Sequence, residues 1–244
     1  MEFIIAEDYE GMSRAAADVV GSVMQDDPAC VLGLATGSTP IGMYACLAED
    51  AASGTVSFAD ATTFNLDEYV GLPGTHDQSY RYFMDQNLFD KVDIDKARTN
   101  LPDGCAADLE AMCDAYETKI EDAGGIDIQV LGIGHNGHIG FNEPCEDFPV
   151  ATHPVDLTES TIQANSRLFD DVADVPRRAV TMGIGTIMKA RKVLVVANGE
   201  GKADIVSEAF TGPVVPEVPA SVLQLHPDVT VVLDAAAAAK LDMA

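Results

Sequence analysis

The sequence predicts a single α/β domain with a doubly wound, mainly parallel sheet, and three observations support this fold class. Short apolar segments alternate along the chain with longer segments in which apolar residues recur at helical spacing. The short segments are nearly continuous in Val, Ile and Leu, as in strands that are buried on both faces of a parallel sheet. No Pro-, Gly- or Ser-rich linker and no repeat of fixed period interrupts the 244 residues. We therefore expect one domain over 1–244.

The expected elements follow one another as strand and helix from the first residues onward. Strands are expected over 3–6, 30–34, 61–65, 126–131, 179–182, 192–197 and 229–233. Helices are expected over 9–25, 41–52, 79–88 and 106–123, after residue 202, and in the alanine-rich tail that runs to 244. The aromatic residues of the 79–88 helix, Tyr80 among them, are interpreted as packing. Residues 146–174 lack a clear period and are either a candidate lid beside a site or a surface excursion with a helix around 160–168.

A glycine-rich loop follows the strand expected at 126–131 and carries the main group of polar side chains. Its sequence is GIGHNGHIGFNEP, and its polar residues are His135, Asn136, His138, Asn142 and Glu143. Ligands bind at the carboxyl ends of strands in open α/β sheets. An imidazole gains and loses a proton near pH 7, and a neighbouring carboxylate can orient it. We therefore expect this loop to be the centre of an active site in which His138 acts with Glu143 and Asn136.

A second loop, ATGSTP over 35–40, joins a buried strand to the helix expected at 41–52. A loop containing Gly37, Ser38 and Thr39 before a helix N-terminus forms an anion cradle. Ser38 or Thr39 can cap the helix, and Pro40 suits its first turn. An ordinary capped turn is the alternative interpretation of so short a motif. The GK[ST] ending of a Walker loop is absent, which disfavours a nucleoside triphosphate and leaves a single small phosphate as the expected ligand.

Two further charged groups are expected at the same edge of the sheet. Asp67 and Glu68 follow the strand at 61–65, and one of them could act as a base, although two acids after a strand are usually solvated. Lys202 begins a helix, which is an unfavourable place for a cation unless an anion lies beside it. Asp67 and His138 would supply two separate acid/base centres near a bound phosphate. This combination suits aldose-to-ketose chemistry on a sugar phosphate, with no metal or redox cofactor.

The composition limits the classes of partner and compartment. The formal charge is −26, from 40 acidic against 14 basic residues, and it disfavours nucleic acid and anionic membranes as partners. No apolar run reaches the ~18 residues that a transmembrane helix needs. The N-terminal segment has acids where a signal peptide has basic residues, so we expect a soluble, cytoplasmic protein. The five cysteines include no CxxC pair, which argues against a disulfide framework and a structural zinc site.

Two other chemistries receive less support from the sequence. His135 and His138 lie three residues apart near Glu143, but the surrounding glycines argue against a regular helix that would align them as metal ligands. No third ligand with suitable spacing is evident. The sequence contains no GxSxG motif, and Cys145 has no identifiable paired base. We therefore expect neither a metal site nor a covalent nucleophile.

Five motifs, in order and nearly end to end, resemble the glucosamine-6-phosphate deaminase family. They are LATGSTPIGMY at 34–44, TFNLDEYVGL at 63–72, LGIGHNGHIGFNEP at 131–144, STIQANSR at 160–167 and the segment around Lys202. The resemblance implies a Rossmann-like fold. It also implies the conversion of glucosamine 6-phosphate and water to fructose 6-phosphate and ammonia, in amino-sugar catabolism.

The resemblance also implies roles for individual residues. Asp67 resembles the base that moves a proton between C2 and C1 of the sugar. His138 resembles the acid/base for ring opening, and Asn136 and Glu143 resemble its supporting partners. The residues that resemble the family's phosphate site are Gly37, Ser38, Thr39, Arg167 and Lys202.

Two departures from the family pattern carry consequences. Position 136 is Asn where many members have Asp. An amide can orient His138 but adds no charge, so the pH profile could differ while the activity is kept. The chain ends soon after Leu233, like the shorter members, whereas longer members form hexamers that N-acetylglucosamine 6-phosphate activates. We therefore expect no such allosteric control, and a monomer or a small homo-oligomer.

Two alternative functions fit parts of the same pattern. A 6-phosphogluconolactonase is similar in fold and hydrolyses an ester of a sugar phosphate, but the TFNLDEY and GFNEP stretches favour the deaminase. A sugar-phosphate sensor would bind without turnover. A sensor that regulates transcription needs a DNA-reading segment, and the first strand is expected at about Phe3. It would also have no need for Asp67, His138 and Glu143 together.

Overall fold

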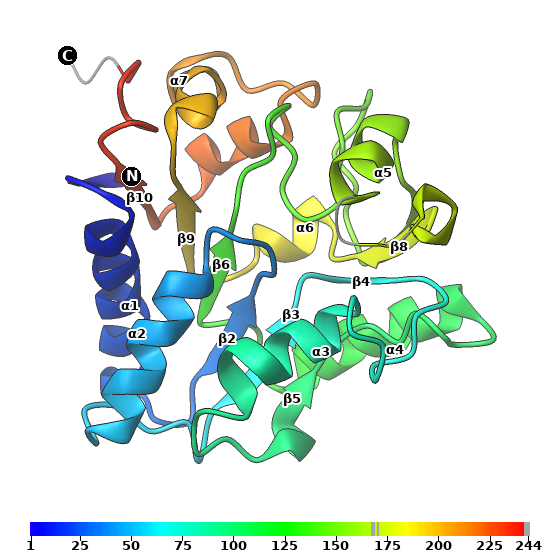
Figure 1. Cartoon of the computed structure of the whole chain (residues 1–244), viewed down its shortest axis with the longest axis horizontal. Helices are drawn as coiled ribbons and strands as arrows, with labels where there is room; N and C mark the ends of the chain where they lie inside the picture. Colours follow the sequence, from blue (N-terminus) through cyan, green and yellow to red (C-terminus); the bar gives the residue numbers. More distant parts are fainter. Residues whose placement is uncertain (167–168, 170, 242–244) are drawn as a thin grey trace.

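The computed structural model describes residues 1–166, 169 and 171–241, and it contains a central sheet flanked by helices (Figure 1). In this part of the chain the central sheet has seven strands, all paired in parallel, in the order β1-β10-β9-β6-β2-β3-β5. The bounds are β1 Glu2–Ala6, β2 Val31–Leu34, β3 Thr62–Asn65, β5 Thr99–Asn100, β6 Ile128–Leu131, β9 Lys192–Ala197 and β10 Val229–Asp234. The predicted α/β class with a mainly parallel sheet is confirmed.

The helices connect these strands. The α-helices are α1 Tyr9–Asp26, α2 Ile41–Ala52, α3 Tyr80–Met84, α4 Leu109–Asp122, α5 Glu159–Asn165, α6 Ile184–Ile187 and α7 Ala203–Thr211. The shorter helical segments are a π-helix, η1 Asp85–Phe89, and the 3-10 turns η2 Lys96–Arg98, η4 Val172–Asp174, η5 Glu200–Lys202 and η6 Pro219–Leu225. α1 packs against α2 and against strands β1, β10 and β9. The long crossovers between parallel strands therefore place helices over the sheet, as a doubly wound fold requires.

A second, small sheet was not predicted from the sequence. It consists, among the described residues, of β4 Asp67–Tyr69, β8 Arg178–Thr181 and β7 His153–Asp156, paired antiparallel in the order β4-β8-β7. Leu66 joins the two sheets. Its N–H donates to the Leu34 carbonyl at 3.0 Å, and its carbonyl accepts from the Met182 N–H at 2.6 Å. The chain therefore leaves the central sheet at Leu66 and enters the small sheet one residue later.

The strand order fixes where a ligand would bind. From β2 the chain continues to β3 and β5 on one side, and β6, β9 and β10 lie on the other side. The order therefore reverses between β2 and β6, and such a switch point leaves a crevice at the carboxyl ends of the two strands. The two loops that the sequence analysis singled out, 35–40 and 132–144, follow β2 and β6 and so meet at this crevice.

Two helix predictions need correction. The alanine-rich tail was predicted to be helical, but residues 235–240 form turns, and residues 242–244 lie outside the described residues. So short a segment does not sustain an α-helix on its own, and the Asp234 carboxylate binds the Ala237 and Gly199 N–H groups instead. The helix predicted over 79–88 is an α-helical turn that continues as the π-helix η1, where the Asp90 N–H bonds to the Asp85 carbonyl.

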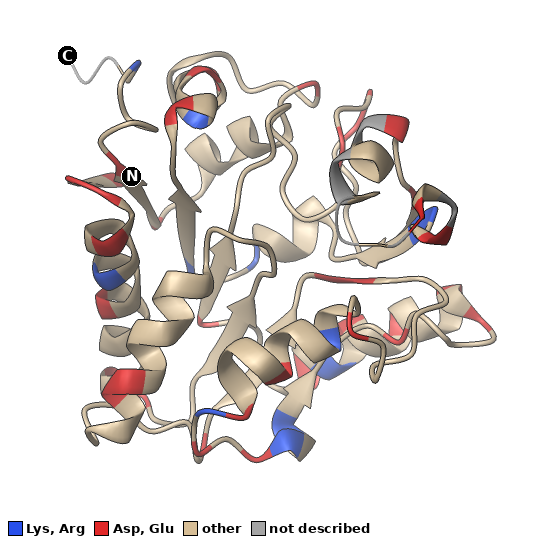
Figure 2. Ribbon diagram, in the orientation of Figure 1, with Lys and Arg blue, Asp and Glu red and all other residues tan. Residues whose placement is uncertain are grey.

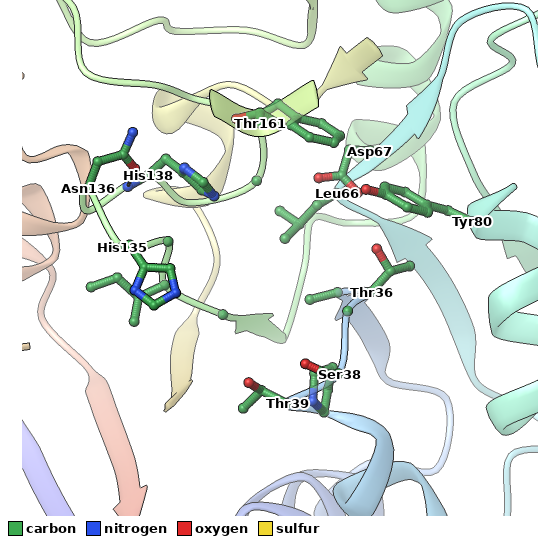
Figure 3. A pocket seen from close by; sticks show the side chains of 18 of the residues that line it. Thr36, Ser38, Thr39, Leu66, Asp67, Tyr80, His135, Asn136, His138 and Thr161 are labelled. Carbon is green, nitrogen blue, oxygen red and sulfur yellow. Dashed lines mark hydrogen bonds between the residues drawn. The ribbon is translucent and has the colours of Figure 1, made fainter. Parts of the chain in front are cut away.

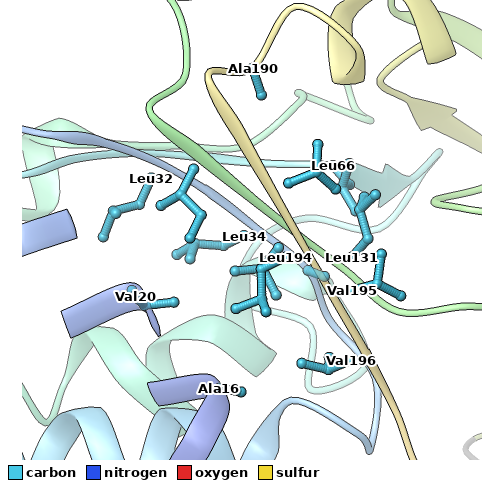
Figure 4. Close-up of a cluster of buried hydrophobic side chains, with 14 of the residues drawn as sticks. Ala16, Val20, Leu32, Leu34, Leu66, Leu131, Ala190, Leu194, Val195 and Val196 are labelled. Carbon is cyan, nitrogen blue, oxygen red and sulfur yellow. The ribbon is translucent and has the colours of Figure 1, made fainter. Parts of the chain in front are cut away.

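The main hydrophobic core lies between the central sheet and its helices. Figure 4 shows side chains of β2, β6 and β9, such as Leu34, Leu131 and Leu194, packed together with Val20 of α1. A smaller cluster lies under the small sheet and α5, and its fully or nearly buried members are Tyr69, Phe141, Leu157, Ile162, Val175 and Ala179. The second cluster holds the small sheet and the 146–174 segment against the loop after β6, because Phe141 belongs to that loop.

Acidic residues are spread over the outer helices and loops, as Figure 2 shows for the same view as Figure 1. Within the described part of the chain, no helix combines the length and the apolar character needed to cross a membrane.

Gly104 marks a close contact beside the strand that carries Asp67. A Cβ at Gly104 would lie 2.0 Å from the Tyr69 carbonyl oxygen, which is backbone and cannot rotate away. The Gly104 carbonyl also accepts the Gly71 N–H at 2.9 Å. Only glycine fits here without displacing β4.

We predict that Gly104→Ala lowers the free energy of unfolding by about 2 to 4 kcal/mol, because the added methyl group forces a backbone shift. Urea denaturation followed by circular dichroism measures this difference. Gly21→Ala is a matched control, since the new Cβ on α1 would lie 3.5 Å from Val56, an ordinary contact. That control should be neutral or gain up to about 1 kcal/mol from helix propensity. Equal stability of Gly104→Ala and the wild type would contradict the prediction.

Candidate active site

A cavity of about 520 Å³ opens at the switch point between β2 and β6. Its walls come from the loop after β2, the Leu66–Asp67 junction, the loop after β6, α5 and η5 (Figure 3). The sequence-predicted residues that line it are Gly37, Ser38, Thr39, Asp67, Asn136, His138 and Lys202. Glu143 is not among the lining residues, but it accepts a hydrogen bond from Asn136, which is. Arg167 lies outside the described residues.

The loop after β2 forms one end of the cavity. Gly37 has a φ of 104°, a left-handed conformation that favours glycine. The prediction that Ser38 or Thr39 caps α2 is wrong, because Pro40 occupies the N-cap position and the helix has no side-chain cap. The Thr39 hydroxyl donates instead to Asn198 Oδ1 at 2.8 Å, which fastens this loop to the end of β9. The exposed Ser38 remains at the mouth of the cavity.

Lys202 supplies a cation to the same cavity. It lies on η5, directly before α7, as predicted. Its Nζ donates to the Ile133 carbonyl at 2.7 Å, so the ammonium group is held against the loop after β6. Burial lowers the pKa of Lys202, because the charged form loses hydration. A bound anion would stabilise the charged form of Lys202, which burial disfavours.

Asp67 lies on the opposite wall, at the first residue of β4. Its side chain is buried, with 6% of the residue exposed. Burial raises the pKa of Asp67 to about 8, and the neighbouring Glu68 adds to the rise. A carboxyl group with this pKa holds or releases a proton within the neutral range. The alternative interpretation of Asp67 and Glu68 as two solvated acids is wrong, because both are buried.

Glu68 has a different task from Asp67. Its carboxylate accepts the backbone N–H groups of Tyr69, Tyr80 and Arg81 at 2.8 to 2.9 Å. Burial raises the pKa of Glu68, although these hydrogen bonds favour its ionised form. The bonds attach the first turn of α3 to β4. Tyr80 is thereby placed against Tyr69 and Phe141, and its side chain also lines the cavity beside Asp67 (Figure 3).

The loop after β6 folds into a tight turn that presents His138. The Gly134 N–H bonds to the His138 carbonyl at 2.9 Å, and a Cβ at Gly134 would lie 2.3 Å from the imidazole ring. Glycine at 134 therefore lets the ring fold back over its own loop. The Asn136 side-chain NH2 donates to Glu143 Oε2 at 2.6 Å. The Asn136 Oδ1 accepts the backbone N–H of His138 at 3.3 Å. His138 Nδ1 lies 3.4 Å from the same Glu143 Oε2.

Glu143 is ionised in this arrangement. Burial opposes its charge, but His138, Thr161 and Asn136 more than offset this and lower the pKa of Glu143 to about 2. The Thr161 hydroxyl, on α5, donates to Glu143 Oε1 at 2.6 Å. The site thus holds two carboxyl groups whose pKa values are shifted in opposite directions. Such a pair is typical of acid/base sites in which the two groups have separate roles.

The sequence assigned no role in the site to Tyr80, His135 and Thr161, which are among the polar residues that line the cavity. Tyr80 looked like one more packing aromatic on a helix. His135 was counted among the polar residues of the loop and weighed as a metal ligand, without a catalytic role; in the structure its Nδ1 lies 3.2 Å from the Gly201 carbonyl. Among the described residues, no group of three or more His, Cys, Asp or Glu side chains could hold a metal ion. Thr161 was inside a recognised motif, but nothing in the sequence linked it to Glu143.

We predict that Asp67→Asn stabilises the protein at alkaline pH. An aspartate in the unfolded chain has a pKa near 3.9, whereas burial raises that of native Asp67 to about 8. The stability that the protonated carboxyl contributes is therefore full below about pH 4 and is lost as the pH rises through about 8. Asparagine carries no proton to lose, so at pH 8.5 the variant should exceed the wild type by about 2 kcal/mol or more.

Urea denaturation at pH 8.5 and at pH 4.5 measures this difference. The advantage of the variant should shrink at the lower pH. A variant that is no more stable than the wild type at pH 8.5 would contradict the raised pKa.

Comparisons with known proteins show the family to which the chain belongs. Residues 7–232 match the family model described as glucosamine-6-phosphate isomerases/6-phosphogluconolactonase. A glucosamine-6-phosphate deaminase from Halothermothrix orenii is 55% identical over 241 residues, which cover 99% of this chain and 100% of the relative. One from Clostridium perfringens (strain 13 / Type A) is 52% identical and covers 98% of both chains.

Solved structures extend the comparison. The structure of a monomeric glucosamine-6-phosphate deaminase is similar with a TM-score of 0.95 and 43% identity, over 98% of this chain and 100% of that one. The 6-phosphogluconolactonase of Trypanosoma brucei has a TM-score of 0.78 at 20% identity, over 99% and 98% of the two chains, which is a likeness of fold alone. The chain therefore belongs to the family of glucosamine-6-phosphate isomerases and 6-phosphogluconolactonases.

Proposed function

We propose that this chain is a glucosamine-6-phosphate deaminase, which converts glucosamine 6-phosphate and water to fructose 6-phosphate and ammonia. The observation that carries the proposal is one cavity with an anion cradle at one end and two acid/base groups, Asp67 and His138, on its walls. The names of relatives that are 52% and 55% identical over nearly the whole chain support it.

The substrate phosphate binds at the end formed by Gly37, Ser38 and Thr39. The hydroxyl of Ser38 and the backbone of this loop offer donors, and Lys202 offers charge. The net charge of −26 repels anions, and the positive charge of Lys202 offsets this repulsion inside the cavity. Arg167 is the second cation that we assign to the phosphate.

His138 opens the sugar ring. The neutral imidazole takes the proton of the C1 hydroxyl and returns a proton to the ring oxygen, which yields the open-chain aldehyde. The ionised Glu143 stabilises the imidazolium that forms in between, and Asn136 holds the carboxylate in place through its 2.6 Å hydrogen bond. The low pKa of Glu143 suits this role, because the group stays charged throughout.

Asp67 then moves a proton from C2 to C1. In the free protein its raised pKa favours the protonated form at neutral pH. The substrate carries an ammonium group on C2, and a positive charge beside Asp67 lowers the pKa of this carboxyl and releases its proton. Asp67 takes the C2 proton and delivers it to C1, while one proton of the C2 ammonium passes to the C1 oxygen. C1 thereby becomes CH2OH and C2 becomes an iminium carbon. Water adds to C2 and ammonia leaves, which completes the ketose.

The remaining expectations belong to the same proposal. Residues 1–244 act as one domain, and 146–174 acts as a lid, since α5 within it borders the cavity. We assign a monomer or a small homo-oligomer, in line with the monomeric relative. The cytoplasm is the compartment in which a sugar phosphate of this kind would be met, and amino-sugar catabolism is the role.

The test incubates chelator-treated protein with glucosamine 6-phosphate and follows ammonia and fructose 6-phosphate together. We expect equal amounts of both products. Asp67→Asn should lower kcat by at least about 1,000-fold, because the proton at C2 then has no acceptor, while the substrate still binds. Asp122→Asn, the same change at an exposed position on α4, serves as the control and should leave turnover unchanged.

Turnover of 6-phosphogluconolactone instead of the amino sugar would favour the lactonase alternative. Binding of glucosamine 6-phosphate without either product would favour a sensor. Unchanged turnover in Asp67→Asn would remove Asp67 from the mechanism.

A further inference from the structure

The two oxygens of the Glu143 carboxylate bind different parts of the structure. Oε2 faces the loop after β6, where it accepts the Asn136 amide at 2.6 Å and lies 3.4 Å from His138 Nδ1. Oε1 faces α5, where it accepts the Thr161 hydroxyl at 2.6 Å. The carboxylate thus bridges the loop that carries His138 and the helix that borders the cavity.

The hydrogen bonds at Thr161 have a fixed direction. An ionised carboxylate only accepts, so the Thr161 hydroxyl must donate to Glu143. Its lone pair then accepts the hydroxyl of Thr158 at 3.0 Å. Thr158 is the N-cap of α5, and its side chain accepts the Thr161 N–H at 3.3 Å. The hydrogen bonds that cap the first turn of α5 therefore also hold the Thr161 hydroxyl that donates to Glu143.

The orientation of Glu143 matters because His138 is not yet fully engaged. His138 Nδ1 is buried and has no hydrogen-bond partner among the described residues, although Glu143 Oε2 is 3.4 Å away. Catalytic hydrogen bonds are often long in the free enzyme and shorten when substrate binds. A rotation of the carboxylate plane would move Oε2 away from the imidazole, and the bond from Thr161 to Oε1 resists that rotation.

We propose that Thr161 is a positioning residue: its hydroxyl fixes the plane of the Glu143 carboxylate so that Oε2 faces His138, and it thereby links the position of α5 to ring opening. The inference rests on the proposed function for its kinetic part. Its structural part, the tie between α5 and Glu143, does not depend on the reaction.

Without the Thr161 hydroxyl, the Glu143 carboxylate can rotate and turn Oε2 away from His138. The imidazolium that forms during ring opening then loses part of its stabilisation, so ring opening slows.

The test compares Thr161→Val, which keeps the shape but lacks the hydroxyl, with Thr161→Ser, which keeps the hydroxyl. We expect Thr161→Val to lower kcat about tenfold or more, the range for a lost hydrogen bond to a charged group. Thr161→Ser should restore kcat. Thr118→Val is the matched control, because this exposed hydroxyl on α4 bonds only to the Asp114 carbonyl of its own helix among the described residues.

Hydrogen exchange of the α5 amides gives a readout without turnover, and exchange should be faster in Thr161→Val than in the wild type and in Thr161→Ser. Unchanged kcat and unchanged exchange in a folded Thr161→Val protein would overturn the inference. A loss of activity that serine does not rescue would also overturn it. No turnover in the wild type would defeat the proposed function, and hydrogen exchange alone would then decide the tie between α5 and Glu143.

Discussion

The burial of one carboxyl group, that of Asp67, is the constraint on which the rest of the site depends. The backbone of Leu66 is hydrogen-bonded to Leu34 of the central sheet on one side and to Met182 on the other, so the next residue has little freedom to turn towards water. The pairing of β4 with β8, in which Asp67 lies opposite Thr181, holds it there. Glu68, equally buried, is occupied by backbone N–H groups of α3. Asp67 alone of the two points into the cavity, where a ligand can change its charge.

The two sheets explain why the cavity can combine unlike environments. The parallel sheet brings the loops after β2 and β6 together, and these supply polar backbone, hydroxyl groups, Lys202 and His138. The small sheet brings Tyr69, next to Asp67 in the chain, which packs against Phe141 of the loop after β6 in an apolar cluster. Burial and the neighbouring Glu68 raise the pKa of Asp67, whereas the nearby His138, Thr161 and Asn136 lower the pKa of Glu143 despite its burial. One site can therefore hold a neutral acid and a permanent anion at the same pH.

Much of this arrangement could be predicted from the sequence, because parallel strands carry a strong local signal and their carboxyl ends meet. The cavity accordingly contains Asp67, Asn136, His138 and Lys202, which were expected to lie at one edge of the sheet. The small antiparallel sheet could not be predicted, because β4 has three residues and its partner β8 lies more than a hundred residues further along the chain. The hydrogen bond from Thr161 to Glu143 and the burial of Glu68 depend on that sheet, so they were hidden as well. The helical tail and the capping of α2 were wrong because tertiary partners, Asp234 and Asn198, took the groups involved.

The most direct test of this account is to titrate the Asp67 carboxyl itself. Carbon-13 NMR of protein labelled at the aspartate carboxyl carbons, with Asp67→Asn to assign the signal, follows its ionisation in the absence of substrate. The account predicts a midpoint near pH 8, which moves to lower pH when an amino-sugar phosphate occupies the cavity. A midpoint near 4, as for an exposed aspartate, would show that burial does not control this group and would contradict the account.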